Sequence, residues 1–417
     1  MQAGAGRAEI DLSGDLFPTE GFISVHDPLH VRVLIIDDGT RIAFVSLELT
    51  SVHEDQINAL RLLVAAVADV QPENVWVCVT HTLSAPHFVP SHLCQTPADH
   101  QKNSILIGAL KTAVRAAAIR AVSELREARF GYSTGTCAVN VNRDIYTAEG
   151  WWLGCSETGP SNKSVPVLCF NSLDGQPIAI LFSYDVQPSV MNSAQMTAGG
   201  LQVSSDMTGA ACRFLEQTFD DNVVALFCIG AAADQAPALK ANFNYAGKNR
   251  QLCAEDIHEA GYVLMEMLGK RLGIEVLRVV VTIECQPPSG RFSVETHTLE
   301  FPGQQIADMQ HIRPTHTYDY LPAAERKEPV YIITLGDVVL IGVRPEISTR
   351  TAEQIKADSP YVQTMVLTMV NGGAKYMAEA QAYDRITYEA MNSFFARGSA
   401  ELLTENISNL LRANRND

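Results

Sequence analysis

The chain has 417 residues, of which 47% are hydrophobic and 19% are charged, and its formal net charge at neutral pH is −16. So large a share of apolar residues excludes an intrinsically disordered chain. The negative charge opposes binding to nucleic-acid phosphates and to anionic lipid surfaces. No stretch approaches the roughly 18 apolar residues of a membrane span. We therefore expect a small-molecule substrate as partner, and neither a nucleic acid nor a membrane.

The chain start and the cysteines both favour a cytoplasmic location. Residues 1–12 include Arg7, Glu9 and Asp11 and hold no apolar run, which is not the pattern of a secretory signal peptide. The nine cysteines are scattered, form no C-x-x-C pair and in part lie in apolar, strand-like runs such as Val77-Cys78-Val79. This usage is typical of reduced, mostly buried thiols.

In chain order, the pattern predicts hairpins that alternate with helices. Two β-rich runs flank an Asp-Gly turn in 31–50 and again in 165–184, and a Gly-Asp turn joins two such runs in 330–343. Apolar residues at three- and four-residue spacing predict helices over 53–69, 100–126, 208–219, 249–272, 350–357 and 400–413. Single strands are expected at 75–80 and 223–229. The fold class is therefore α/β, with mixed β-sheets built from hairpins and single strands and covered by helices. Because no linker stands out, we expect one domain over 1–417.

Polar segments follow several of these strands. His81, Gln187, Asp234 and Glu346 each stand just beyond a predicted strand. Strand ends that meet at one edge of a sheet commonly surround a pocket. Each segment also has a plain structural interpretation, since Asp234 could cap a helix and His81 could be a hydrogen-bonded residue of the core. On composition alone, Tyr376 and Tyr388 are as readily explained by packing.

The order of these segments resembles the catalytic domain of the neutral/alkaline non-lysosomal ceramidases and their bacterial relatives. The similarity runs nearly end to end through short motifs: Thr80-His81-Thr82-Leu83-Ser84-Ala85-Pro86, Asn140-Val141-Asn142-Arg143, Gln187-Pro188-Ser189, residues 230–237, Pro345-Glu346, and Tyr376 with Tyr388-Glu389. The resemblance implies a ceramidase-like catalytic domain. At this length we expect no appended C-terminal sandwich domain.

The resemblance implies amide hydrolysis at a zinc ion. Carried over, the metal ligands are His81, Glu346 and Tyr376, and Gln187 stands at the place of a further ligand histidine. Arg143 and Tyr388 fall on the family's active-site arginine and catalytic tyrosine. Such a donor set can leave one coordination position open for water or substrate, and the arginine and the phenol can stabilise a developing oxyanion.

Three departures separate this chain from the family pattern. Gln187 replaces a ligand histidine, and because an amide oxygen is a poorer zinc donor, Mn²⁺ becomes an alternative to Zn²⁺. Leu83 replaces a second histidine, and Ala236 replaces a serine. We therefore expect a substrate other than ceramide, namely a small, polar, cytoplasmic compound.

The leading hypothesis is a metal-dependent hydrolase of a small polar amide, lactam or ester, in which metal-activated water attacks the carbonyl. A second hypothesis keeps the pocket but assigns it an isomerase, cyclase or lyase reaction, with Tyr388 or Asp234 as acid and base. A third is a catalytically dead small-molecule binding protein. Whether the chain forms a homo-oligomer stays open.

Overall fold

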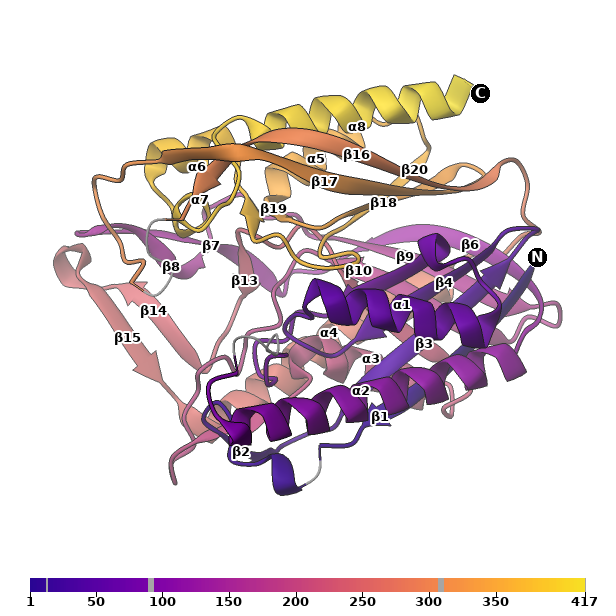
Figure 1. Ribbon diagram of the computed structural model, residues 1–417, viewed down its shortest axis with the longest axis horizontal. Helices are drawn as coiled ribbons and strands as arrows, with labels where there is room; N and C mark the ends of the chain where they lie inside the picture. The colour runs from indigo at the N-terminus through magenta and orange to yellow at the C-terminus, as the bar shows by residue number, and fades with distance from the viewer. Residues whose placement is uncertain (13, 89–93, 307–310, 417) are drawn as a thin grey trace.

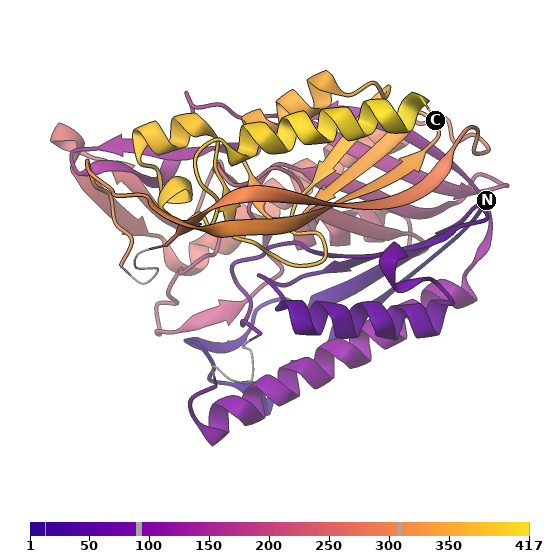
Figure 2. The ribbon, with the colours of Figure 1, turned by 45° about the horizontal axis from the view of Figure 1, so that its top comes forward.

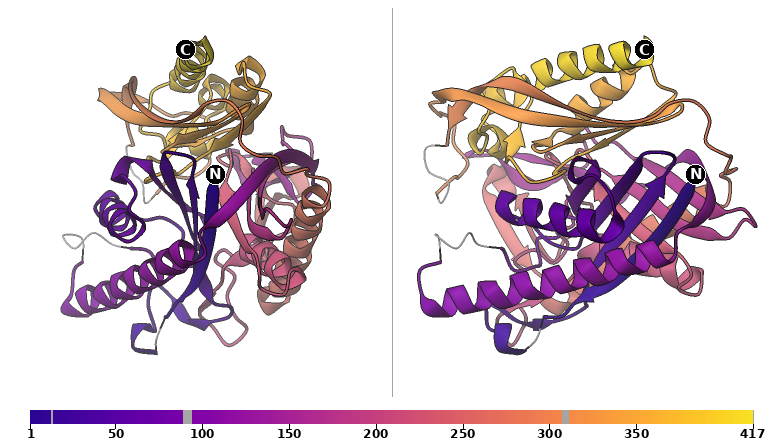
Figure 3. Two further views of the ribbon diagram at one scale, coloured as in Figure 1. Left: turned by 90° about the vertical axis from the view of Figure 1, so that its right-hand side faces the viewer. Right: turned by 45° about the vertical axis from the view of Figure 1, so that its right-hand side comes forward.

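The computed structural model describes residues 1–12, 14–88, 94–306 and 311–416 (Figure 1). The C-terminal part, orange to yellow, forms one layer above the rest of the molecule, and Figures 2 and 3 show the same stacking from other sides. The predicted α/β fold of mixed sheets covered by helices is confirmed.

The larger sheet has eight strands. In spatial order they are β12 (Val224–Ile229), β10 (Pro177–Tyr184), β9 (Ser164–Ser172), β6 (Arg126–Thr136), β1 (Gln2–Ile10), β3 (Leu29–Asp37), β4 (Arg41–Leu47) and β5 (Val75–Val79). The pairs β10–β12 and β4–β5 are parallel and the other pairs are antiparallel. Strands β4 and β12, from opposite halves of the sheet, also lie close together. The Ser46 hydroxyl on β4 donates to the Phe227 carbonyl on β12 at 2.6 Å.

In the part of the chain that the structure describes, four helices cover this sheet. They are α1 (Glu54–Ala68), α2 (Pro97–Ser123), α3 (Asp206–Thr218) and α4 (Gly261–Val280). Helix α2 packs directly on β1, where Gly4 and Gly6 leave room: a Cβ built on Gly6 would lie 2.3 Å from the Ala117 carbonyl oxygen. The glycines of β1 therefore set how closely the helix approaches the sheet.

Within the described ranges, the second sheet has four strands and two covering helices. The strands are β16 (Phe292–Gln305), β17 (Leu321–Leu335), β18 (Val338–Val343) and β20 (Gln363–Leu367), and the helices are α5 (Thr349–Asp358) and α8 (Ser399–Asn416). Because side chains alternate along a strand, Ile333 and Leu335 pack against the larger sheet, while Val330 and Ile332 pack against α5 and α8. Both faces of β17 are thus apolar, and one core joins the two sheets.

Short elements complete the fold. They are β2 (Phe22–Val25) with β11 (Leu201–Val203); β7 (Asn140–Thr147) with β8 (Gly150–Ser156) and β13 (Gln235–Pro237); β14 (Asn242–Ala246) with β15 (Leu252–Asp256); β19 (Glu346–Ile347) with β21 (Tyr376–Met377); the helices α6 (Ala380–Arg385) and α7 (Tyr388–Met391); and short 3₁₀ turns at Gly14–Leu16, Pro72–Asn74, Lys248–Arg250 and His258–Ala260.

The three predicted hairpins are confirmed as β3–β4, β9–β10 and β17–β18. The helix predicted over 249–272 was wrong in its first half, because residues 252–256 form β15 and pair with β14. Asn249 and Arg250 adopt positive φ angles in the turn between these strands, which a continuing helix does not allow. Helix α4 begins only at Gly261 and runs on to Val280.

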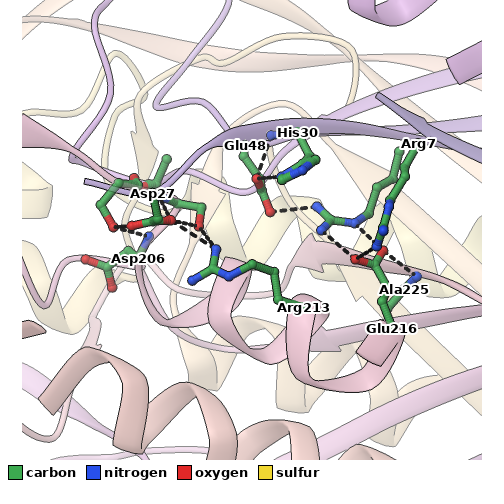
Figure 4. Close-up of polar contacts among 12 residues, drawn as sticks. Arg7, Asp27, His30, Glu48, Asp206, Arg213, Glu216 and Ala225 are labelled. Atoms are coloured by element: carbon green, nitrogen blue, oxygen red, sulfur yellow. Dashed lines mark hydrogen bonds and ion pairs between the residues drawn. The ribbon is translucent and has the colours of Figure 1, made fainter. Parts of the chain in front are cut away.

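A buried ion network ties β3 and the end of β4 to α3 (Figure 4). Arg32 donates to Glu216 at 2.8 Å and to Glu48 at 2.6 Å, and the three side chains are about 1% exposed. Arg7 also contacts Glu216 at 2.5 Å. Because each buried charge has a partner, the network holds the helix against the sheet without an isolated charge in the core.

Candidate metal centre and cavity

The side chains predicted to act together come from the ends of well-separated strands. His81 follows β5, Gln187 follows β10, Glu346 begins β19 after β18, and Tyr376 begins β21. Strands β19 and β21 are parallel, with Glu346 and Tyr376 paired in register. The four side chains line one cavity of about 710 Å³, within the size range of small-molecule sites. The structure therefore brings all four predicted ligands together.

His81 is held in a constrained geometry. Its φ angle is 64°, a left-handed conformation that costs free energy for a residue other than glycine. Its backbone N–H donates to the Leu49 carbonyl at 3.0 Å, and its Nδ1 lies 2.5 Å from the Thr50 carbonyl oxygen. Because a carbonyl only accepts, Nδ1 carries a proton, and Nε2 is the ring nitrogen left for a metal or another partner.

His81 Nε2 lies beside Glu346. The distance from His81 Nε2 to Glu346 Oε2 is 3.5 Å, and both side chains are buried. Metal–ligand bonds of about 2.0–2.2 Å at tetrahedral angles place two donor atoms about 3.3–3.6 Å apart. The imidazole and the carboxylate therefore have the spacing of two ligands on one ion.

Tyr376 brings a phenol to the same cavity. Burial raises the pKa of its phenol, while the nearby Arg143 guanidinium opposes that shift. Within the described residues, no three His, Cys, Asp or Glu side chains gather closely enough to hold a metal. A metal site at this place therefore depends on the phenol as well as on His81 and Glu346.

Gln187 bridges two charged groups. Its Nε2 donates to Glu346 Oε2 at 2.5 Å, and its Oε1 accepts from Arg143 Nη1 at 2.5 Å. The two neighbours dictate this orientation, because a carboxylate needs a donor and a guanidinium needs an acceptor. The amide oxygen thus faces Arg143, and it would have to leave Arg143 to bind a cation.

Arg143 is the buried cation of the site. Its Nε and Nη2 contact Glu389 Oε1 at 2.7 and 2.6 Å, and its guanidinium lies 5.2 and 5.7 Å from the ring centroids of Tyr376 and Tyr388. Burial lowers its pKa, but the charges of Tyr376 and Glu389 outweigh burial and raise the pKa well above the usual value. Arg143 therefore stays charged.

Tyr388 stands next to this cation. Its ring lies 5.8 Å from that of Tyr376 and 5.7 Å from that of Trp152, and its hydroxyl accepts from Asn392 Nδ2 at 3.1 Å. Burial raises the pKa of the Tyr388 phenol, so it keeps its proton. It can therefore donate a hydrogen bond into the cavity.

Two further carboxyl groups lie near Arg143. Burial, together with the charges of Glu389 and Asp234, raises the pKa of Asp144 well above its usual value. Asp234 accepts from Asn142 Nδ2 at 3.1 Å and from the Thr349 backbone N–H at 2.9 Å, and burial raises its pKa to about 7. The Asp234 carboxylate is not part of the cavity wall, so this geometry gives its predicted acid–base role no support.

The remaining wall differs from the family pattern as the sequence indicated. Leu83 and Ala236 both line the cavity, so neither position offers a polar group there. Sequence reasoning missed Lys240, which also lines the cavity, and Asp144, the partner of Glu389. Asp144 directly follows Arg143 in the chain, and that adjacency was the one signal available. No local pattern marks Lys240.

Comparison with known proteins gives structural matches only. No family model matches the sequence, and a search of the curated proteins finds no match. A ceramidase complexed with C2 aligns with a TM-score of 0.75 at 14% identity, covering 100% of this chain and 75% of that one. The chain has the fold of the neutral ceramidases.

A second match agrees with the first. The neutral ceramidase from Pseudomonas aeruginosa gives a TM-score of 0.72 at 15% identity, covering 100% of this chain and 74% of that chain. The resemblance drawn from the sequence motifs is thereby confirmed for the fold. Among the described residues, no helix of this ceramidase-like fold is long and apolar enough to cross a bilayer.

Proposed function

We propose that this chain is a metal-dependent hydrolase of a small polar amide, lactam or ester. The observation that carries the proposal is the 3.5 Å approach of His81 Nε2 to Glu346 Oε2, with Nδ1 of the same ring held by the Thr50 carbonyl. A metal-binding histidine usually has its second nitrogen fixed in this way. The ceramidase-like fold supports the same reaction class.

His81, Glu346 and Tyr376 would hold the ion, which we propose to be Zn²⁺, with Mn²⁺ as the alternative. When bound, the metal would supply a Lewis acid that lowers the pKa of water or polarises a carbonyl. Gln187 keeps Glu346 oriented through the hydrogen bond from its Nε2. If the Gln187 amide rotated so that its oxygen bound the ion, the hydrogen bond from Arg143 to that oxygen would be lost.

Arg143 and Tyr388 act on the substrate. The guanidinium carries a permanent charge, and the neighbouring phenol keeps its proton. Both can donate to the oxygen that gains negative charge as the carbonyl is attacked. Glu389 fixes the position of Arg143 through its Nε and Nη2. We propose a cytoplasmic substrate without long apolar chains.

The test begins with metal binding. Purified protein freed of metal should take up about one zinc ion per chain in a calorimetric titration. Glu346→Gln and His81→Ala should weaken this affinity at least tenfold, whereas Glu353→Gln, an exposed glutamate on α5, should not change it. Equal zinc binding by the wild type and the Glu346→Gln variant would remove the basis of the proposal.

The reaction is tested separately. A panel of small amides, lactams and esters is incubated with the zinc-loaded protein in ¹⁸O-labelled water. Hydrolysis places one labelled oxygen in the acid product. Turnover without incorporation of the label would contradict hydrolysis and favour an isomerase, cyclase or lyase.

One observation favours a binding protein as a second candidate. The amide of Gln187 has both its ends engaged, by Arg143 and by Glu346, so the network is satisfied without a cation. A binding protein would show stabilisation by a ligand and no turnover. The same panel of compounds distinguishes a hydrolase from a binding protein when the melting temperature of the protein is measured together with product formation.

A further inference from the structure

The cavity wall is cationic in an acidic protein. The chain carries a net charge of −16, yet Arg143, Lys240 and Lys375 line the cavity and Glu346 is its one carboxylate among the described residues. Arg143 is paired with Glu389, and Glu346 accepts from Gln187. The two lysines are therefore the charges left for a ligand.

Lys240 is the more informative of the two. It follows β13 and is partly buried, and no hydrogen bond or ion pair of its ammonium is found among the described residues. Burial lowers its pKa; the Cys155 thiol and, more weakly, the Asp206 carboxyl oppose that shift, and the charge of Arg143 adds to it. A partly buried ammonium that makes no hydrogen bond or ion pair costs free energy.

Another lysine of the same chain shows what a protein partner would look like. Lys163 is also partly buried, and its ammonium donates to Asn140 Oδ1 at 2.9 Å and to Ser161 Oγ at 2.8 Å. Lys240 faces the cavity instead. The difference indicates that the partner of Lys240 enters with the ligand.

The surroundings of Lys240 suit a small polar anion. Asn192 and Asn242 line the same cavity, and amide groups can donate to a carboxylate or accept from an amide N–H. Lys375 is exposed where it lines the cavity, so it adds a second positive charge toward solvent. Cations around a cavity raise the local concentration of anionic ligands.

We propose that the substrate carries a carboxylate, as an N-acyl amino acid or an acidic lactam does, and that Lys240 binds this group. That the substrate contains an amide bond rests on the proposed function. That it also carries a carboxylate rests on the cavity residues alone. Lys240 is a binding residue here and takes no part in bond cleavage.

The test compares pairs of probes that differ in one charge. N-acetyl amino acids with side chains from glycine to phenylalanine, each beside its neutral carboxamide, are titrated into the zinc-loaded protein by calorimetry. We expect at least one acid to bind at least tenfold more tightly than its amide. Lys240→Gln should remove this preference, Lys240→Arg should keep it, and Lys248→Gln, an exposed matched control, should not alter it.

The outcomes separate this inference from the proposed function. Equal binding of acid and amide in every pair, or binding of neither, would contradict the proposal that the substrate carries a carboxylate. A preference unchanged by Lys240→Gln would overturn the role of Lys240. Stronger binding of inorganic phosphate than of any acid would replace the carboxylate by a phosphate group. A Lys240-dependent preference, together with failure of the zinc titration or of the labelled-water test described above, would refute the hydrolase and leave the anion site in place.

Discussion

The buried ion network of Figure 4 leads to a specific prediction about acid stability. Burial would raise the pKa of Glu48, but the Arg32 guanidinium and the hydrogen bond from His30 lower it from 4.5 to about 2. Because the pKa is depressed in the folded state, the stabilisation is fully present above the unfolded value of 4.5. It is lost as the pH falls through the folded value.

The size of this effect follows from the shift. At about 1.4 kcal/mol per pKa unit, a depression from 4.5 to about 2 corresponds to about 3 kcal/mol at neutral pH. That matches the low end of what removing one partner of a buried ion pair costs, about 3–5 kcal/mol. About 2 kcal/mol of it should be lost between neutral pH and about pH 3.

Urea unfolding at a series of pH values measures the stabilisation that the Glu48 carboxylate contributes. The free energy of unfolding of the wild type minus that of Glu48→Gln should be about 3 kcal/mol at neutral pH and should shrink by about 2 kcal/mol toward about pH 3. Glu353→Gln serves as the control on an exposed carboxylate and should follow the wild type at every pH. A constant difference between wild type and Glu48→Gln across the range would refute the reasoning.

Three further predictions follow from other contacts. Because burial raises the pKa of Asp144, its protonated carboxyl can donate to Glu389, and Asp144→Asn keeps such a donor. Asp144→Asn should therefore change the free energy of unfolding by less than about 1 kcal/mol, whereas Asp144→Ala should cost about 1–3 kcal/mol. Equal losses in urea unfolding would contradict a donor role of Asp144 toward Glu389. Gln187→His should raise the zinc affinity at least about tenfold, about 1.4 kcal/mol, because an imidazole is a better zinc donor than an amide; weaker calorimetric binding would count against this position as a ligand. Gly6→Ala should cost about 1–3 kcal/mol, because its Cβ would lie 2.3 Å from a carbonyl oxygen of α2. Gly108→Ala, on α2 with nothing within 4 Å of the new Cβ, should not lower the melting temperature.

The local pattern of the chain was sufficient for most elements. The hairpins β3–β4 and β9–β10 were predicted because an Asp-Gly turn between β-branched runs is a short-range signal. The failure at residues 249–260 has a short-range cause as well. Apolar residues there match a helical spacing, but the pairing of β14 with β15 is a contact that spacing does not reveal.

The candidate site, too, was predicted from the sequence only in part. The sequence by itself determined which donor types follow which strands, because His81, Gln187, Glu346 and Tyr376 lie next to motifs that can be read along the chain. That they line one cavity was decided by the pairing of strands far apart in the sequence. Strand pairing depends on side chains of both partners, so no single segment encodes it.

Only the tertiary structure decided what each polar group does. It turned the Gln187 amide between Arg143 and Glu346, gave Asp144 a carboxylate neighbour, and left the Lys240 ammonium without a hydrogen bond or ion pair among the described residues. The physical reason is that charge and hydrogen bonding are governed by burial and by neighbours within a few ångströms. Those neighbours come from distant parts of the chain and exist only once it has folded.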